Sequence, residues 1–423
     1  MFKSLTYYLI SILIHMAACE NKHILSEKVT ASKILGNPDY QAISYSGYRG
    51  ISRSEQPTVA EIKEDLLILS AMGIKLLRTY DVTYDHSPNL LKAISELKVE
   101  NPHFEMYVML GAWIDCKNAW TGLEPDHHSE SEKNASEIER AVSLANKYPD
   151  IVKIIAVGNE AMIHWATACY VEPKVILKWV NYLQNLKSNG QLDKDLWITC
   201  SDNFASWGGG DPSYHCDELK QLFHSVDFIP LHTYPMHDTH YNPSFWGVRP
   251  EEAELSETEK IEKAMFRSVE YAKAQYYSVQ NYMKSIGVDK PIHIGETGWA
   301  TVSNENYGIE DSKAADEYKS AIYYRSLRKW CDSLKISCFF FEAFDEPWKD
   351  ATNARGSENH FGLFTVDGQA KLALWDLVDN GIFNGLGRNN HSISKTYKGS
   401  LDSVLLNVGL PPIKDAQIPI KFY

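Results

Sequence analysis

The sequence predicts an α/β fold, a (β/α)8 barrel with long loops on the face where its strands end. Two observations lead to this prediction. Eight short apolar runs alternate with amphipathic helical stretches, a pattern typical of a closed parallel barrel. The chain of 423 residues also exceeds the roughly 250 residues of a bare barrel, and most of the surplus follows strand ends.

The strand candidates are short, apolar and rich in β-branched residues, as expected of strands that are buried on both faces. In chain order they span 41–48, 74–80, 105–111, 151–158, 196–201, 226–232, 291–295 and 336–342.

Helical candidates lie between these strands. In the first of them Ile62, Leu66 and Leu69 share one face, which gives it an apolar side to bury. Thr58 is placed to cap this helix, and Pro173 stands where a first helical turn tolerates proline. The candidates span 58–72, 90–97, 135–148, 173–187, 261–286 and 314–334, and a short helix over 216–224 would connect strands five and six.

The surplus length lies in loops that would all rise from one face of the barrel. They span 113–132, 203–215, 234–256 and 344–364. Five tryptophans are found in them: Trp113, Trp120, Trp207, Trp246 and Trp348. A single exposed tryptophan is usually a packing residue, but several on one rim favour sugar-binding platforms.

The N-terminal residues have the order of a targeting segment. Lys3 precedes a mostly apolar run that is too short to span a bilayer, and Ala17-Ala18-Cys19 resembles a bacterial lipobox. This order favours a signal peptide over 1–19 and lipidation of Cys19. The alternative is cleavage near Ala18 with Cys19 incidental.

A lipidated Cys19 would attach the protein to the bacterial cell envelope, at the outer membrane, with the domain on its periplasmic or surface face. The membrane would be a partner only through this anchor. Residues 20–36 would form a polar tether, 37–381 the barrel domain, and 382–423 an extension packed on the barrel.

Composition narrows the set of partners. The formal net charge is −13 and no basic cluster carries interleaved aromatics, which argues against nucleic acid. The 24 Tyr, 15 Phe and 11 Trp suit an enzyme with sugar-stacking surfaces. No cysteine pattern has zinc spacing. Cys116 and Cys169 both follow strand ends. They could form a disulfide on the rim of the barrel or remain free thiols.

Two carboxylates occupy corresponding positions. Glu160 ends the run Val157-Gly158-Asn159-Glu160, and Glu296 follows Ile294-Gly295. The tips of parallel barrel strands meet on one rim, where active sites of such barrels lie. A glycosidase needs one acid to protonate the leaving oxygen and another to attack or support the sugar carbon. Solvated loop glutamates are the alternative, and the matching positions disfavour it.

These residues also resemble a known family. Val157-Gly158-Asn159-Glu160 and Gly295-Glu296-Thr297-Gly298-Trp299 are similar to the acid/base and nucleophile motifs of glycoside hydrolase family 17. Segments 43–50, 77–80 and 341–349 resemble its bacterial branch. The resemblance implies a TIM barrel and retaining cleavage of β-1,3-glucosidic bonds in glucans such as laminarin. We expect a monomer that uses no cofactor and no metal ion.

The resemblance implies that Glu296 is the nucleophile and Glu160 is first the acid, then the base that activates water. Retention requires carboxyl groups about 5–5.5 Å apart. Tyr234, just past strand six, is placed to donate a hydrogen bond to Glu296, and a packed loop tyrosine is the alternative. Asn159 would hold the 2-hydroxyl of the sugar.

Further residues are candidates for substrate contact. Trp299 would stack on the sugar beside Glu296, or else pack under the rim. Asp202 and Asn203 would bind hydroxyls or make a turn. Glu342 would bind hydroxyls or pair with Arg49, Arg78 or Lys349. The remaining candidates are Tyr48, Arg78 and Trp348.

Other functions remain open on the sequence. His164, His232 and His237 lack metal-site spacing, which favours a hydrogen-bonded active-site histidine. Glucan transfer would use the same catalytic residues with a sugar hydroxyl in place of water. A non-catalytic glucan-binding lipoprotein is the third possibility, and the presence of both Glu160 and Glu296 argues against it.

Overall fold

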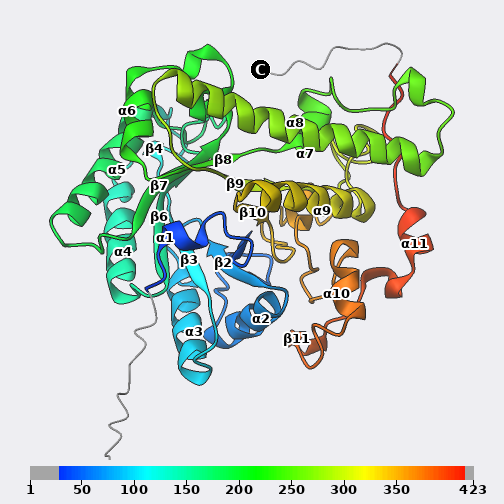
Figure 1. Ribbon diagram of the computed structural model, residues 1–423, viewed down its shortest axis with the longest axis horizontal. Helices are drawn as coiled ribbons and strands as arrows, with labels where there is room; N and C mark the ends of the chain where they lie inside the picture. Colours follow the sequence, from blue (N-terminus) through cyan, green and yellow to red (C-terminus); the bar gives the residue numbers. More distant parts are fainter. Residues whose placement is uncertain (1–27, 415–423) are drawn as a thin grey trace, which may run out of the picture.

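A computed structural model describes residues 28–414 of the chain. Its centre is a closed barrel of parallel strands in the order β1-β10-β9-β8-β7-β6-β3-β2, surrounded by helices (Figure 1). The predicted (β/α)8 barrel and its eight strands are therefore confirmed. The strands are β1 (Gln41–Ser44), β2 (Ile74–Arg78), β3 (Tyr107–Ala112), β6 (Val152–Asn159), β7 (Trp197–Asn203), β8 (Ile229–His232), β9 (Ile292–Gly298) and β10 (Cys338–Phe341).

The strands are buried on both faces, which explains their near-continuous apolar sequences. Every residue of β3 and of β9 is buried, and so is every residue of β6 except Asn159. Pairing of Ile43 in β1 with Phe340 in β10 closes the barrel.

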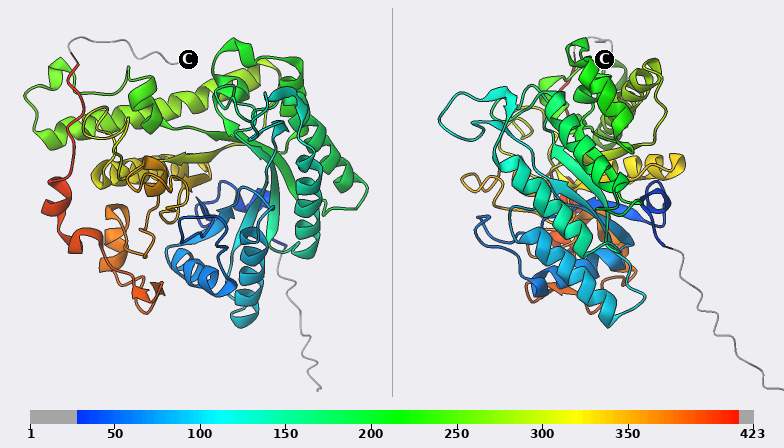
Figure 2. Two further views of the ribbon diagram at one scale, coloured as in Figure 1. Left: turned by 180° about the vertical axis from the view of Figure 1, so that it is seen from behind. Right: turned by 90° about the vertical axis from the view of Figure 1, so that its left-hand side faces the viewer.

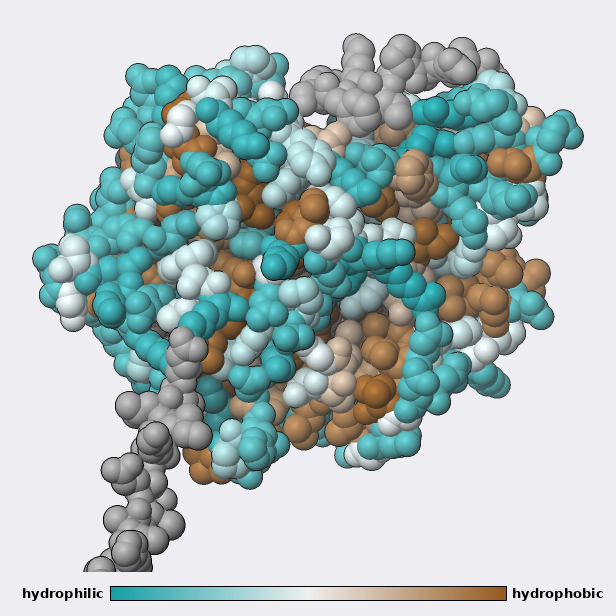
Figure 3. Space-filling view, in the orientation of Figure 1, coloured by the Kyte–Doolittle hydropathy of each residue, from teal (hydrophilic) through white to brown (hydrophobic). Residues whose placement is uncertain are grey.

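The outer helices begin at the residues that the sequence marks. Thr58 accepts a hydrogen bond from the Glu61 N–H, and the Glu61 carboxylate accepts one from the Thr58 N–H, which forms a capping box. Hydrophilic side chains cover the outer surface over α4 and α5 (Figure 3). The helices are α2 (Val59–Ala71), α3 (His86–Glu100), α4 (Lys133–Lys147), α5 (Pro173–Ser188), α6 (Asp217–Ser225), α8 (Glu257–Ser285) and α9 (Glu317–Leu334).

A short helix, α1 (Ala31–Ile34), closes the end of the barrel where the strands begin. Ala31 and Ile34 are fully buried against apolar residues that include Phe228 and Phe339. The expected tether over 20–36 is therefore wrong at its C-terminal end, because these residues belong to the barrel core. Cys19 and the signal segment lie outside the described residues.

The opposite end of the barrel carries the long loops. A hairpin of β4 (Cys116–Lys117) and β5 (Asp126–Glu130) extends beyond β3, on the side of the barrel opposite α1 (Figure 2, right). The sequence did not predict it, because two residues of β4 and a polar β5 carry no apolar alternation. Helix α7 (Pro235–Tyr241) follows β8, and the π-helical segment Ala205–Gly209 follows β7.

The described part of the C-terminal extension packs on the barrel domain. Buried Arg388 forms an ion pair with Asp65 of α2 at 2.8 Å, and Val404 packs with Leu372 and Trp375. The described part of the extension contains β11 (Gly387–Arg388), β12 (His391–Ser392), a 3-10 helix over Thr396–Gly399 and α11 (Leu401–Leu405). The barrel domain before it ends with α10 (Trp375–Asp379), and its short 3-10 helices cover Pro212–Tyr214, Pro250–Glu252, Ser357–His360 and Leu372–Leu374.

Two further properties concern the described chain as a whole. No helix between residues 28 and 414 combines the length and apolar character that a membrane crossing needs. The six cysteines of this range are free thiols, including Cys116 and Cys169. These two residues nevertheless share a backbone hydrogen bond of 3.0 Å, from the Cys116 N–H to the Cys169 carbonyl.

Candidate active site

The local backbone brings the two glutamates to the same rim. Gly158 has φ +80°, a conformation that glycine adopts without strain, and the register of β6 shifts between Ala156 and Asn159. Glu160 follows directly, with its N–H bonded to the Ser201 carbonyl at 3.0 Å. Glu296 lies within β9 and is the partner of His232 in β8. Both carboxylates line one cavity of about 910 Å³.

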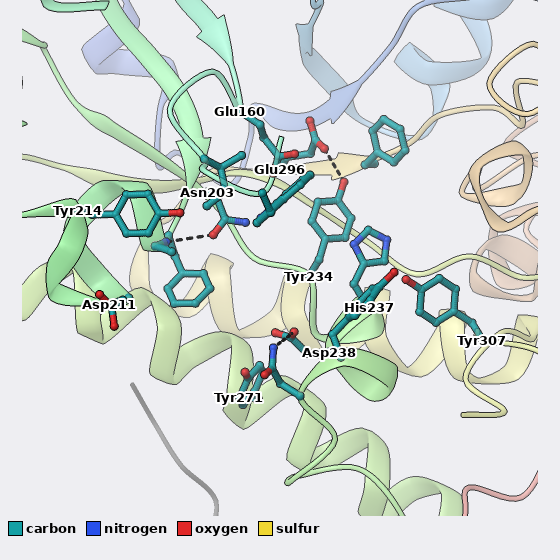
Figure 4. A pocket seen from close by; sticks show the side chains of 18 of the residues that line it. Glu160, Asn203, Asp211, Tyr214, Tyr234, His237, Asp238, Tyr271, Glu296 and Tyr307 are labelled. Atoms are coloured by element: carbon teal, nitrogen blue, oxygen red, sulfur yellow. Dashed lines mark hydrogen bonds between the residues drawn. The ribbon is translucent and has the colours of Figure 1, made fainter. Parts of the chain in front are cut away.

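Three hydrogen-bond donors surround the carboxylate of Glu296. The Tyr234 hydroxyl donates to Oε1 at 2.6 Å, and the Tyr80 hydroxyl donates to Oε2 at 2.9 Å. The guanidinium of Arg78 donates to Oε2 as well. Figure 4 shows Tyr234 directed at Glu296. The position of Tyr234 is as expected from the sequence, whereas Tyr80 was not among the expected site residues.

These contacts determine the charge of Glu296. Its burial alone would favour the neutral acid, but the positive charge of Arg78, the electrostatic interaction with His232 and the two tyrosine hydroxyls outweigh burial and lower the pKa of Glu296 to about 2. Glu296 is therefore an ionised carboxylate at any ordinary pH, which is the state that a nucleophile requires.

The environment of Glu160 is different. Its side chain is 21% exposed, and Oε1 lies 3.1 Å from Nδ1 of the buried His232. The other ring nitrogen of His232 lies 2.8 Å from the Ser201 hydroxyl. When Glu160 is ionised it can only accept, so Nδ1 of His232 carries the hydrogen of this contact. Glu160 is thus held in place and still open to a ligand.

Arg78 lies behind the two glutamates rather than in the cavity. It is fully buried, and it donates to the Gly295 carbonyl at 3.0 Å and to Oδ1 of Asn159 at 2.5 Å. Arg78 is not among the residues that line the cavity, although the sequence suggested that it contacts substrate, and both of its terminal nitrogens donate to protein acceptors. The same contact orients the Asn159 amide, whose NH2 group, a donor, then faces away from Arg78.

Trp299 does not stack on a sugar in this structure. Its side chain is fully buried, and its indole N–H donates to the Ala314 carbonyl at 2.8 Å. The ring packs against Tyr323 and Trp246, with centroids 5.1 and 5.8 Å away. Trp207 is buried as well. Packing under the rim, the alternative that the sequence left open for Trp299, is what the structure has.

Asp202 and Asn203 have separate environments. Asp202 is fully buried and accepts hydrogen bonds from the Met162 N–H at 2.8 Å and the Ser206 hydroxyl at 2.5 Å. Burial raises the pKa of Asp202 to about 6, against the effect of these bonds. It anchors loops and does not reach the cavity. Asn203 does line the cavity, with Oδ1 bonded to the Ala205 N–H.

Three candidates from the ends of β1 and β10 also lie outside the cavity lining. Glu342 is buried and pairs with Lys349 at 2.7 Å, and burial raises its pKa well above the ordinary value. Tyr48 is buried, with its hydroxyl 3.1 Å from Nδ1 of His86. The half-buried Trp348 donates to Glu346 at 3.0 Å and packs edge-on against Tyr48.

The cavity wall is largely aromatic and was only partly anticipated. Asn203 and Tyr214 lie on one side of the two glutamates, and His237 and Tyr307 lie on the other (Figure 4). Tyr214 and Tyr307 have a weak signal in the sequence, because each is a single aromatic residue in a long loop. The lining residues are Glu160, Ile163, Trp165, Asn203, Phe204, Ala205, Gly210, Asp211, Tyr214, Tyr234, His237, Asp238, Tyr241, Asn242, Tyr271, Glu296, Tyr307, Phe341, Glu358 and Phe361.

The three histidines take part in ring stacking and hydrogen bonding. His164 stacks on Tyr214 and His237 stacks on Tyr234, with centroids 4.2 and 4.8 Å apart. His232 is bonded to Glu160 as described above. Within residues 28–414 no group of three or more His, Cys, Asp or Glu side chains is arranged to hold a metal ion.

An ionised, fully hydrogen-bonded carboxylate opposite a more exposed one, in an aromatic cavity at the C-terminal rim of a (β/α)8 barrel, defines a glycoside hydrolase. Comparison with known families agrees with this class. Residues 42–362 match the BtgE/BtgC glycoside hydrolase domain, and the chain belongs to that family. The resemblance to family 17 glucanases is thereby confirmed.

Several known proteins are similar to this chain. A crystal structure of an endo-laminarinase from Formosa Hel1_33_131 is 61% identical, with a TM-score of 0.92, over 93% of this chain and 100% of that one. A family 17 β-1,3-glucanosyltransferase from Rhizomucor miehei is 17% identical, with a TM-score of 0.54, over 79% of this chain and 96% of that one, and shares the fold.

The curated relatives are more distant. The btgC proteins of Aspergillus niger and Aspergillus oryzae, the second named "Probable glucan endo-1,3-beta-glucosidase btgC", are 24% and 23% identical over 310 and 329 residues. These matches cover 71% and 75% of this chain but only 37% and 39% of those proteins. The chain thus spans less than half the length of the curated relatives that it matches.

Proposed function

We propose that this protein is an endo-acting β-1,3-glucanase that hydrolyses laminarin-type glucans with retention of configuration. The observation that carries the proposal is the environment of Glu296, whose contacts with Arg78, Tyr80 and Tyr234 hold it ionised beside a partly exposed Glu160. The likeness over 93% of the chain to a protein described as an endo-laminarinase supports the substrate and the mode of action.

The first step forms a glycosyl-enzyme. Glu160, in its protonated form, gives its proton to the glycosidic oxygen, while Oε1 or Oε2 of Glu296 attacks the anomeric carbon. The bond from that carbon to the leaving oxygen breaks and an ester bond to Glu296 forms. As negative charge leaves Glu296, the hydrogen bonds from Tyr234 and Tyr80 weaken together with its pull on Arg78.

The second step releases the sugar. Glu160 is now ionised and removes a proton from a water molecule, whose oxygen attacks the anomeric carbon from the side of the departed sugar. The ester bond breaks, Glu296 regains its charge, and Glu160 regains its proton. We propose that the NH2 group of Asn159, whose Oδ1 accepts from Arg78, donates to the 2-hydroxyl during both steps.

The direct test is incubation of the purified protein with laminarin, mixed-linkage glucan and cellulose. We expect laminarin to be cleaved to a range of oligosaccharides from the earliest times, with the anomeric configuration retained in proton NMR. Mass spectrometry of the products distinguishes hydrolysis from transfer, since transfer yields products longer than the substrate oligosaccharide. Cleavage of cellulose in preference to laminarin would overturn the proposed linkage.

We also propose that Cys19 carries a lipid that attaches the protein to the cell envelope. The proposal is supported by the order of Lys3, the apolar run and Ala17-Ala18-Cys19 in the sequence.

A further inference from the structure

The hairpin beyond β3 carries an indole that the cavity does not use. Trp120 is 66% exposed, although large aromatics usually bury most of their surface. The backbone of Trp120 has φ +59°. Bulky residues rarely adopt this left-handed conformation, and they keep it mainly where the surrounding structure enforces it. The fold therefore holds a large apolar side chain at the surface in a backbone conformation that is unfavourable for it.

A single carboxylate holds this indole in place. Oδ1 of Asp115 accepts a hydrogen bond from the indole N–H of Trp120 at 3.1 Å and another from the indole N–H of Trp113 at 2.8 Å. Asp115 is itself fixed, because its N–H donates to Oδ1 of Asn134 at 3.1 Å. The edge of the Trp120 ring is therefore bonded to protein, while much of its surface remains open to solvent.

The turn that presents Trp120 is also well bonded. The Asn118 side chain donates to the Glu124 carbonyl at 2.9 Å, and the Thr121 hydroxyl donates to the Asn118 carbonyl at 2.7 Å. The turn thus has a defined shape, which lowers the entropy lost when a ligand settles on it.

The hairpin adjoins the wall of the catalytic cavity. β3 pairs directly with β6, the strand that leads to Glu160. The hairpin is bonded to the loop that follows Glu160, through the Cys116 N–H to the Cys169 carbonyl and the Glu172 N–H to the His127 carbonyl. That loop carries Trp165, which lines the cavity and is 65% exposed.

We propose that Trp120 is a binding platform for a segment of β-glucan chain that extends beyond the catalytic cavity, and that Asp115 positions it. This inference rests on the proposed glucanase function. The apolar face of a pyranose ring covers an indole, and both surfaces then release water. The site would bind a neutral sugar unit of a long chain, and short oligosaccharides that fill only the cavity would not reach it.

The experiment compares substrates of two lengths. Steady-state kinetics on laminarin and on a β-1,3-linked trisaccharide would be measured for the full protein and for Trp120→Ala, Trp120→Phe and Asp115→Ala. We expect Trp120→Ala to raise KM for laminarin about tenfold more than KM for the trisaccharide, a loss consistent with the burial of one sugar face. Trp120→Phe keeps an aromatic face and should show a smaller change of the same kind.

Asp115→Ala tests the positioning role. It leaves Trp120 in the chain but removes the acceptor for its N–H, so KM for laminarin should rise in the same length-dependent way. A matched control is Leu123→Ser, which alters another side chain of the same hairpin that is also 66% exposed and should leave the ratio of the two KM values as in the wild type.

The outcomes separate the inference from the function on which it rests. A wild-type protein that cleaves neither substrate refutes the proposed function. A wild-type protein that cleaves both, with the same KM ratio in Trp120→Ala as in Leu123→Ser, refutes the platform and leaves the function standing. Thermal melts accompany the kinetics, and a length-independent loss of rate with a lowered melting temperature in Trp120→Ala would assign Trp120 to packing and also refute the platform.

Discussion

Tyr234 donates its hydroxyl hydrogen to Oε1 of Glu296 across 2.6 Å, between the ends of the neighbouring strands β8 and β9. Because a tyrosine hydroxyl is a donor to an ionised carboxylate, this contact favours the charged form of Glu296. It also orients the carboxylate in the cavity.

We predict that Tyr234→Phe makes activity more sensitive to acid. The pKa of Glu296 is depressed to about 2, so its ionised form is present above that pH and is lost only as the pH falls through it. A hydrogen bond to a charged group is worth about 1.5–3 kcal/mol, or roughly one to two pKa units. The acidic limb of the kcat/KM profile should move to higher pH by that amount.

The control is Tyr307→Phe, which removes a hydroxyl from the same cavity. An acidic limb that stays where it is in Tyr234→Phe would contradict the role of this hydrogen bond in keeping Glu296 charged.

Replacement of Glu296 by Ala should abolish turnover, and azide or formate should restore part of it. The small anion would occupy the vacated space and attack the anomeric carbon in place of the carboxylate, which gives a product of inverted configuration. The measurement is product analysis by NMR with and without azide. Glu358→Ala, which removes another carboxylate of the cavity, should show no such rescue. Activity near the wild-type level in a clean Glu296→Ala preparation would remove the nucleophile role.

Glu160→Gln should retain substrate binding and lose at least about 10²-fold in rate on substrates with poor leaving groups, the scale of general acid catalysis. Substrates with activated leaving groups need no proton in the first step and should lose much less. Pre-steady-state rates on the two kinds of substrate make the comparison, and an equal loss on both would show that Glu160 is not the acid.

Trp299→Ala should act on stability rather than on substrate binding. Removal of a fully buried indole that packs on Tyr323 lowers the free energy of unfolding by about 3–5 kcal/mol. Denaturant unfolding measures this loss. Trp165→Ala, at an exposed residue of the cavity wall, is the matched control and should alter unfolding by less than about 0.5 kcal/mol while it raises KM. A rise in KM without loss of stability in Trp299→Ala would instead show that Trp299 contacts the substrate.

Cys19→Ser should yield a protein without acyl chains. Stable anchoring requires two or more lipid chains, so the variant should move from the detergent phase to the aqueous phase of a phase-separation experiment. Mass spectrometry of the N-terminal peptide identifies the lipid directly. Membrane attachment that survives the substitution would contradict lipidation at this residue.

Periodic features of the sequence predicted the barrel, because each buried parallel strand must be apolar on both faces. The same logic could not locate the β4–β5 hairpin, which is short and polar, or α1, whose four residues seal the barrel end within a segment that reads as a tether. The apolar pattern also placed the ends of strands less accurately than the strands themselves. The sequence predicts a first strand that ends at residue 48, whereas β1 ends at Ser44.

The catalytic residues were predictable because a strand tip defines a direction in space, so Glu160, Glu296 and Tyr234 could be assigned to one rim. Residues beyond the tips could not be oriented in this way. Trp299 comes three residues after Glu296, yet its indole is bound by the Ala314 carbonyl outside the cavity. The sequence does not predict the role of Tyr80, because nothing distinguishes a strand-end tyrosine that donates to Glu296 from one that only packs.

Helix α1 covers the end of the barrel where the strands begin. It seals the barrel at the end away from Glu160 and Glu296, so the chain joins the fold beneath the strands (Figure 2, right). The first described residues of the chain therefore lie at one end of the barrel and the cavity lined by Glu160 and Glu296 lies at the other. A polymer can enter that cavity without contacting the end of the barrel that α1 covers.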